Sequence, residues 1–208
     1  MSSVSGGTCS DGATVSDRAP LDPLFSALRD LTRWLEAEKI PYAVIGGVAV
    51  SLLSIPRVTR DVDAVVLLER ERWEGFLAAG RFFGFEPRQP DSLDFARQTR
   101  VLLVRHQPSG IEVDLSFGAL PFEREAIERA RPTEIAGLSI RIPRPEDLVV
   151  MKAVAHRTRD LLDIAAILEA NPDLDRRHVR EWVEEFSRVL EMPEILGDLE
   201  AILDRYSG

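Results

Sequence analysis

Two aspartates separated by one residue are the most suggestive chemical feature of the sequence. Asp61 and Asp63 lie in an apolar segment that reads DVDAVVLL and has the composition of a β-strand. Because successive strand side chains point to opposite faces, we expect both carboxylates on one face, roughly 7 Å apart along the chain. Two such carboxylates repel each other unless a cation lies between them, and Mg²⁺ or Mn²⁺ suits oxygen ligands of this kind. The pair indicates a divalent-metal site; a solvated strand edge is the alternative.

A glycine pair precedes the aspartates. The strand-length apolar run Tyr42–Ile45 leads into Gly46 and Gly47, and the small apolar residues of Val48–Leu53 favour a helix after them. Glycine adopts positive φ and has no Cβ, so a ligand can approach the backbone closely, and the first N–H groups of a helix attract anions. A plain turn is the alternative interpretation. Three further candidates for phosphate binding lie between this helix and the aspartates: Arg57, Thr59 and Arg60.

The order of these features resembles the signature of the DNA polymerase β-like nucleotidyltransferase superfamily. A strand, a glycine pair and a helix come first, and thirteen residues separate Gly47 from the acidic strand at Asp61. In that superfamily a third carboxylate is expected on a later strand, and the strand-like segment Ile111–Phe117 carries Asp114. The resemblance implies that Asp61, Asp63 and Asp114 are the catalytic and metal-binding residues.

The segment RVTRDVD, residues 57–63, looks most like the minimal bacterial branch that contains AbiEii/AbiGii-type (type IV) toxin nucleotidyltransferases. The resemblance extends from about Pro41 to Leu168. It includes the pattern Pro-x-x-Leu-x-x-x-Lys, which ends here at Lys152 within an otherwise apolar helical run. In this branch the lysine is expected to meet the nucleoside triphosphate. The implied nucleotide-binding residues are Gly46, Gly47, Arg57, Thr59, Arg60 and Lys152.

Two more acidic residues follow this lysine. Asp160 and Asp163 are three residues apart and therefore neighbours on one helix surface. We interpret them as orienting Lys152 or Arg157 rather than binding metal, with solvated helix caps as the alternative. The interval from Arg157 to Asp160 is shorter than the usual loop of the family, which puts the basic contacts there in doubt.

Hydrophobic patterning predicts an α+β fold. The resemblance implies a polymerase β-like nucleotidyltransferase core, a mixed β-sheet flanked by helices, followed by a C-terminal helical bundle. The expected domains are a disordered leader at 1–19, the core at 20–142 and the helical domain at 143–208. Phe95–Val104 and Gly110–Phe117 are predicted as antiparallel strands. Expected helices are Leu21–Lys39, Glu69–Ala79, Pro121–Arg131 and four pieces after Pro143.

The charge and the residue composition of the chain limit the classes of function that it can have. The formal net charge of −9 argues against broad non-specific binding to nucleic acid, so an RNA contact needs a local basic patch. Arg141, Arg144, Arg157 and Arg159 are candidates for that patch. The single cysteine, Cys9, excludes an intramolecular disulfide. The sequence has no apolar stretch long enough to span a membrane and no signal peptide, which predicts a cytoplasmic protein without membrane contact.

The expected function is Mg²⁺-dependent transfer of a nucleoside monophosphate from an NTP to an acceptor hydroxyl. RNA, such as a tRNA 3′ end, ranks first as acceptor, with a cognate antitoxin as a further partner. A small cationic antibiotic of the aminoglycoside type and a protein hydroxyl are the alternative acceptors. A catalytically silent nucleotide-binding or antitoxin-like module is the rival from another class, and the presence of all three aspartates and both glycines argues against it.

Overall fold

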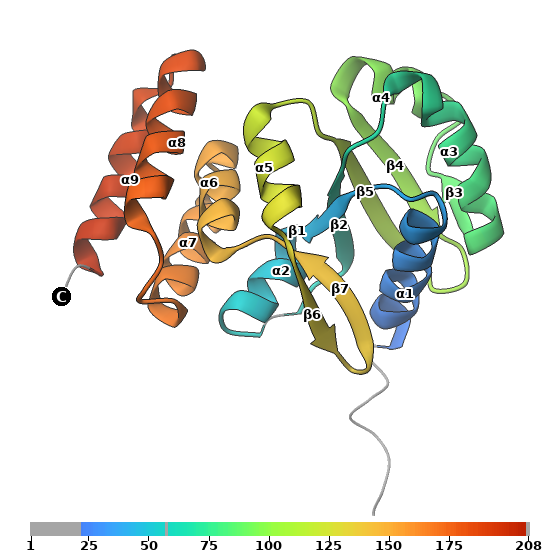
Figure 1. Cartoon of the computed structure of the whole chain (residues 1–208), viewed down its shortest axis with the longest axis horizontal. Helices are drawn as coiled ribbons and strands as arrows, with labels where there is room; N and C mark the ends of the chain where they lie inside the picture. The colour runs from blue at the N-terminus through green and yellow to red at the C-terminus, as the bar shows by residue number, and fades with distance from the viewer. Residues whose placement is uncertain (1–21, 57, 207–208) are drawn as a thin grey trace, which may run out of the picture.

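The computed structural model describes residues 22–56 and 58–206 (Figure 1). The expected leader at 1–19, with Cys9, and the candidate Arg57 lie outside these residues. The model contains a mixed sheet flanked by helices and a group of C-terminal helices, as the sequence predicted.

Five strands form the central sheet in the order β1-β2-β5-β4-β3. The neighbours β2 and β5 are parallel, and the remaining pairs are antiparallel. The parallel pair is the part that matters for the site, because it brings two strands distant in the sequence into lateral contact. The strand bounds are β1 Tyr42–Ile45, β2 Asp61–Val66, β3 Phe85–Pro87, β4 Val101–His106 and β5 Ile111–Phe117.

Helices cover both faces of this sheet. Figure 1 shows α1 and α3 on one side, and α2, α5 and the C-terminal helices on the other. The helices of the sheet region are α1 Asp22–Ala37, α2 Gly46–Leu53, α3 Trp73–Gly80, α4 Ser92–Thr99 and α5 Pro121–Arg129. A hairpin, β6 Arg131–Ile135 with β7 Leu138–Ile142, follows α5. The C-terminal helices are α6 Pro145–Ala155, α7 Thr158–Ala170, α8 Arg176–Val189 and α9 Pro193–Arg205.

The leucines of α1 explain why this helix packs on the sheet. Leu24, Leu28, Leu31 and Leu35 recur at helical spacing and are all buried. Trp34 on the same helix is fully buried and stacks on Phe76 with ring centroids 4.1 Å apart. Trp34 is therefore a core residue.

One predicted strand was wrong in its first half. The segment expected as a strand from Phe95 begins within α4, and the strand β4 starts only at Val101. The helix ends at Arg100, which adopts a left-handed conformation with φ of +62°. Glycine is the usual residue at such a helix end, so an arginine there gives the sequence no stop signal. The edge strand β3 was also missed, because it has only three residues and ends in a proline.

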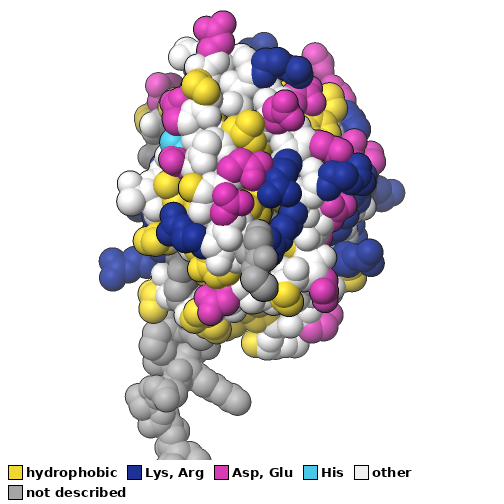
Figure 2. Space-filling view, turned by 90° about the vertical axis from the view of Figure 1, so that its left-hand side faces the viewer, with side chains coloured by type: hydrophobic (Ala, Val, Ile, Leu, Met, Phe, Trp, Pro, Cys, Tyr) yellow, Lys and Arg dark blue, Asp and Glu magenta, His cyan; other side chains and the backbone are white. Residues whose placement is uncertain are grey.

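The apolar core is continuous between the sheet region and the C-terminal helices, since one cluster of buried side chains includes residues from both. The domain boundary at residue 143 stays a proposal. Figure 2 shows the face on the side of the C-terminal helices, where acidic and basic side chains are interspersed. Among the described residues, no helix combines the length and apolar character needed to cross a bilayer.

Candidate active site

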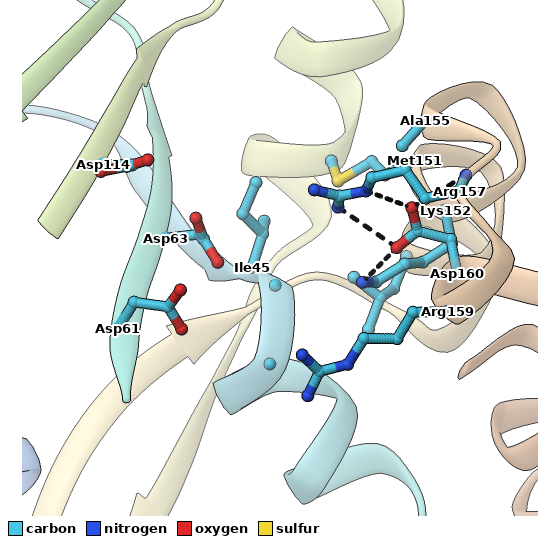
Figure 3. A pocket seen from close by; sticks show the side chains of 13 residues that line it. Ile45, Asp61, Asp63, Asp114, Met151, Lys152, Ala155, Arg157, Arg159 and Asp160 are labelled. Carbon is cyan, nitrogen blue, oxygen red and sulfur yellow. Dashed lines mark hydrogen bonds and ion pairs between the residues drawn. The ribbon is translucent and has the colours of Figure 1, made fainter. Parts of the chain in front are cut away.

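A cavity of about 360 Å³ lies between the sheet and the C-terminal helices. Figure 3 shows three aspartates on one side of it and basic side chains from α6 and α7 on the other. Of the residues predicted from the sequence, the cavity brings together Gly46, Gly47, Asp61, Asp63, Asp114 and Lys152. Thr59 and Arg60 are not among its lining residues, and the buried hydroxyl of Thr59 has no hydrogen-bond partner among the described residues.

The parallel pairing of β2 and β5 places the third aspartate beside the first two. Asp63 lies directly opposite Asp114, and Asp61 lies opposite Glu112. Burial raises the pKa of Asp63 to about 6, and repulsion from Asp61 and Asp114 adds to the shift. Burial also raises the pKa of Asp114. The strand pairing thus concentrates negative charge that the surrounding protein only partly compensates.

Gly46 is the residue that lets α2 begin beside the aspartates. It adopts a φ of +62°, and a Cβ added to it would lie 1.9 Å from Oδ2 of Asp63. Positive φ was expected at this glycine, but the close approach is to a carboxylate of the protein. Only glycine fits at this junction, where β1 ends opposite Asp63 and the helix starts.

Arg88 holds the third aspartate from the side. Its Nη2 donates a hydrogen bond to Oδ1 of Asp114, and its Nη1 donates to Glu112 over 2.6 Å. Glu112 also accepts a hydrogen bond of 2.6 Å from Arg105, and these two bonds lower its pKa. Glu112 is therefore bound to two arginines. Sequence reasoning missed Arg88, because its contact depends on β3 lying next to β4.

Lys152 faces the aspartates from α6. It is only 6% exposed, and its Nζ lies 2.8 Å from Asp160 and 2.9 Å from Asp163. Burial by itself lowers the pKa of Lys152, but the hydrogen bonds and charges of these two carboxylates outweigh it and raise the pKa overall. Asp160 also accepts a hydrogen bond of 2.6 Å from Nε of Arg157. These contacts agree with the interpretation that Asp160 and Asp163 orient Lys152 or Arg157, and the role of the two aspartates in the reaction stays a prediction.

The comparison with known families decides what kind of protein carries this cavity. The profile of the family described as "Nucleotidyl transferase AbiEii toxin, Type IV TA system" matches residues 29–205, well over half of the chain. The chain belongs to this AbiEii family. It is therefore an enzyme of the nucleotidyltransferase type, and the polymerase β-like resemblance seen in the sequence is confirmed.

One solved structure agrees with the fold of this AbiEii-family enzyme, and a second shows a weaker similarity. An antigenic nucleotidyltransferase-like protein from Paracoccidioides brasiliensis has a TM-score of 0.52 at 19% identity, with 86% of this chain and 93% of that chain covered. The antibiotic-resistance factor ANT(2'')-Ia has a TM-score of 0.48 at 17% identity, over 89% of this chain and 95% of that one. No curated protein matches the sequence.

The four arginines expected to form an RNA-binding patch do not all lie together in the AbiEii-family enzyme. Arg157 and Arg159 line the cavity, and the Arg159 guanidinium makes no hydrogen bond or ion pair with the described residues. Arg144 instead pairs with the buried Asp147, with Nε 3.1 Å from Oδ2. Arg141 donates a hydrogen bond to the carbonyl of Ala130. The basic surface at the cavity is therefore smaller than expected.

Proposed function

We propose that this protein transfers a nucleoside monophosphate from an NTP to an acceptor hydroxyl in a Mg²⁺-dependent reaction, with Mn²⁺ as a substitute. The observation that carries the proposal is the opposition of charges across one cavity. Asp61, Asp63 and Asp114 form one wall, and Lys152 and Arg157 lie on the other. A triphosphate with bound metal matches this pattern, because its cation meets the aspartates while its phosphates meet the basic groups.

The carboxylates fit a metal that the substrate helps to hold. Among the described residues, no group of three or more histidine, cysteine or acidic side chains is close enough to hold an ion alone. Mg²⁺ is usually bound through one or two carboxylates together with substrate phosphates and water, so a complete cage is not needed. Burial, with added repulsion from Asp61 and Asp114, raises the pKa of Asp63, and a bound cation would stabilise its charged form. We assign Asp61 and Asp63 as the main ligands and Asp114 as an additional one.

Bound Mg²⁺ would neutralise the triphosphate and stabilise charge at the α-phosphate. The acceptor oxygen forms a bond to the α-phosphorus, the bond from that phosphorus to the bridging oxygen breaks, and pyrophosphate leaves. In this proposal the acceptor proton passes to Asp114. Arg88 occupies Oδ1 of Asp114, whereas Oδ2 accepts no hydrogen bond from a described residue. Burial raises the pKa of Asp114, which makes its carboxylate a stronger base.

Basic groups position the phosphates in this proposal. An ammonium group has three donors, and Lys152 uses two of them on Asp160 and Asp163, which leaves one for the triphosphate. The N-terminus of α2, at Gly46 and Gly47, offers backbone N–H groups at the cavity. Arg57, Thr59 and Arg60 precede β2 directly in the sequence and remain candidates for the same role.

RNA, such as a tRNA 3′ end, is the acceptor we propose, and a cognate antitoxin is the proposed partner. The family description, a toxin of a type IV toxin–antitoxin system, supports this choice. Arg157 and Arg159 at the cavity supply positive charge for an RNA strand in a protein of net charge −9.

A screen of acceptors tests the proposal. Purified protein with Mg²⁺ is incubated with each α-³²P-labelled NTP and, separately, with total cellular RNA, aminoglycosides or cell protein. We expect label on RNA, and tRNA-sized product would identify the acceptor. Label on an antibiotic or a protein would refute RNA as the acceptor and would still support nucleotidyl transfer. Absence of transfer to any acceptor, from a protein that still binds Mg²⁺-NTP, would favour the silent binding module.

The proposed metal site also predicts a change in thermal stability. Mg²⁺ at about ten times its dissociation constant should raise the Tm of the wild-type protein by roughly 2–5 °C, because binding to the folded state alone stabilises it. The Asp63→Asn variant should lose most of this shift. Asp94→Asn, a change at an exposed residue of α4, is the matched control and should keep it. An equal shift in both variants would contradict the assignment of Asp63.

A further inference from the structure

A second cavity lies at the other end of the parallel strand pair. It has a volume of about 510 Å³, and its lining includes Leu67 and Leu68 directly after β2 and Gly118 directly after β5. Along the strands, about 20 Å separates Asp61 from Leu67, and about 13 Å separates Asp63 from Leu67 and Asp114 from Gly118. The second cavity is therefore distinct from the candidate active site.

Four arginines line this cavity against a single lining carboxylate, that of Glu69. They come from segments far apart in the sequence: the turn Arg70–Arg72 before α3, the end of α4 and the second turn of α5. The protein as a whole is acidic, so a concentration of four positive charges is unexpected from composition. The four are Arg70, Arg72, Arg100 and Arg124.

Backbone carbonyls hold three of these arginines in place. Arg70 donates to the carbonyl of Arg97 over 3.3 Å, and Arg72 donates to the carbonyl of Glu38 over 3.3 Å. Arg100 donates from Nε to the carbonyl of Phe117 over 2.9 Å. A carbonyl fixes the position of a guanidinium without cancelling its charge. The cavity is therefore a positioned and still positive site.

The acidic groups nearby offset only part of this charge, because one lining carboxylate, Glu69, stands against four arginines. Oε2 of Glu123 accepts hydrogen bonds from the backbone N–H groups of Ala119 and Leu120, where it caps the start of α5. Oε2 of Glu38 lies 3.9 Å from Arg72 at the edge of the ion-pair range. Arg124 has no hydrogen bond or ion pair of its side chain with the described residues, so its charge is available.

Trp73 forms an apolar base below the arginines. The guanidinium carbons of Arg70 and Arg100 lie 5.9 Å and 6.0 Å from the centre of its ring, within the range of cation–π attraction. The indole is 3% exposed, stacks on Phe117 and donates its N–H to the carbonyl of Leu68. The NMR signal of this indole N–H should therefore respond to binding in the cavity. The ring itself is too buried to stack on a nucleic-acid base.

We propose that this arginine pocket, defined by Arg70, Arg72, Arg100 and Arg124, binds a phosphate group. Guanidinium groups present paired N–H donors that match phosphate oxygens, and an anion would relieve the mutual repulsion of the four charges. The source that fits the proposed function is a backbone phosphate of the RNA acceptor, and this reading rests on that function. A free phosphate compound is the second source, and the experiment separates the two.

The first measurement uses the three tryptophan indole N–H signals in a ¹H–¹⁵N NMR spectrum of ¹⁵N-labelled protein without Mg²⁺. Titration with inorganic phosphate, and separately with a short single-stranded RNA, should shift the signal of Trp73 and leave that of Trp34 unchanged. A Trp73→Phe variant assigns the signal. Arg124→Gln, which removes no carbonyl contact, should weaken the response about fivefold or more. Arg177→Gln, at an exposed residue of α8, is the matched control.

The second measurement separates the sources by following RNA binding as a function of salt concentration. Each lost phosphate contact lowers the slope of log K against log[salt] by about 1, so we expect Arg124→Gln and Arg70→Gln to weaken binding across RNA sequences with a shallower slope. A response of Trp73 to phosphate with unchanged RNA binding would support a free phosphate compound. A Trp73 signal unmoved by both probes, with an unchanged salt slope, would overturn the proposal.

The proposed function and the proposed phosphate site can be refuted independently of each other. Both measurements omit NTP and Mg²⁺, so they do not depend on nucleotidyl transfer. An enzyme that labels an antibiotic and binds no RNA would refute the proposed acceptor. The phosphate titration would still show whether the arginine pocket binds phosphate.

Discussion

At the scale of single residues, carboxylates face cations across the cavity, and neighbouring side chains hold two of these groups in place. Asp114 is held by Arg88, and Lys152 is held by Asp160 and Asp163. A fixed partner limits the movement of a side chain and sets its orientation. A reaction that depends on positioning and charge stabilisation requires such orientation. The residues that orient the site are therefore as testable as the residues proposed to react.

Replacement of Arg88 tests this orientation. Arg88→Gln should lower kcat about 10- to 100-fold, because Asp114 loses the hydrogen bond that fixes its carboxylate, while KM for the NTP changes little. Steady-state kinetics with the acceptor found in the screen measure both parameters. Arg105→Gln is the matched control, since Arg105 binds Glu112 but not Asp114. Equal losses in both variants would show that the acidic network matters as a whole and that Arg88 has no special role.

At the scale of elements, the junction of β1 and α2 has the strictest geometry. A side chain at position 46 would need positive φ and would occupy the space of the Asp63 carboxylate. Gly46→Ala should therefore lower activity by about 100-fold or more and destabilise the fold by about 1 kcal/mol or more.

The control for this prediction is another glycine to alanine change within a helix. Gly75 lies in α3, and a Cβ there meets no atom within 4 Å. Gly75→Ala should be neutral or stabilising by up to about 1 kcal/mol. Thermal unfolding and transfer assays on both variants make the comparison, and an active, stable Gly46→Ala enzyme would refute the described junction.

His106 links two elements, and its burial predicts a pH effect. The ring on β4 has no exposed surface and contacts Asp30 of α1 at 3.2 Å and Ser109 at 2.7 Å. Burial lowers the pKa of His106 below 6.5, and this outweighs the attraction of Asp30. Below pH 6.5 the unfolded chain therefore takes up a proton at this residue that the folded protein resists, so the contribution of His106 to stability falls as the pH drops. Asp63, with its pKa raised to about 6, contributes with the opposite sign below that pH.

Denaturant unfolding between pH 5 and 7.5 measures this dependence. His106→Gln should remove the contribution of this ring, so that lowering the pH below 6.5 costs the variant less stability than it costs the wild-type protein, although the variant itself is less stable. A variant with the same slope as the wild-type protein would contradict the role given to His106.

The sequence predicted those elements whose signals are local. The strand Tyr42–Ile45, the acidic strand and α7 follow from apolar runs and clear breaks, and all three are present. The end of α4 at Arg100 could not be predicted, because a left-handed arginine carries no local signal. Arg88 was missed for a different reason: its contact with Asp114 depends on the order of β5, β4 and β3, which is a property of the whole sheet.

At the scale of the whole molecule, the sheet and the C-terminal helices share one core and enclose one cavity between them. The sheet contributes the aspartates and the helices contribute the lysine and arginines (Figure 3). The aspartates assigned to the metal and the basic groups assigned to the phosphates thus come from different parts of the chain. The proposed reaction therefore requires the assembled chain, which fits the match of the AbiEii family across residues 29–205.

The most direct test of this account compares two isotopic labels in one reaction. With the acceptor found in the screen, we expect label from [α-³²P]NTP to become attached to it and label from [γ-³²P]NTP to appear only in pyrophosphate. Asp63→Asn should lose at least about 1,000-fold of this transfer with its fold intact, while Asp94→Asn retains it. Transfer of the γ label to the acceptor, or undiminished transfer by Asp63→Asn, would contradict nucleotidyl transfer at the three aspartates.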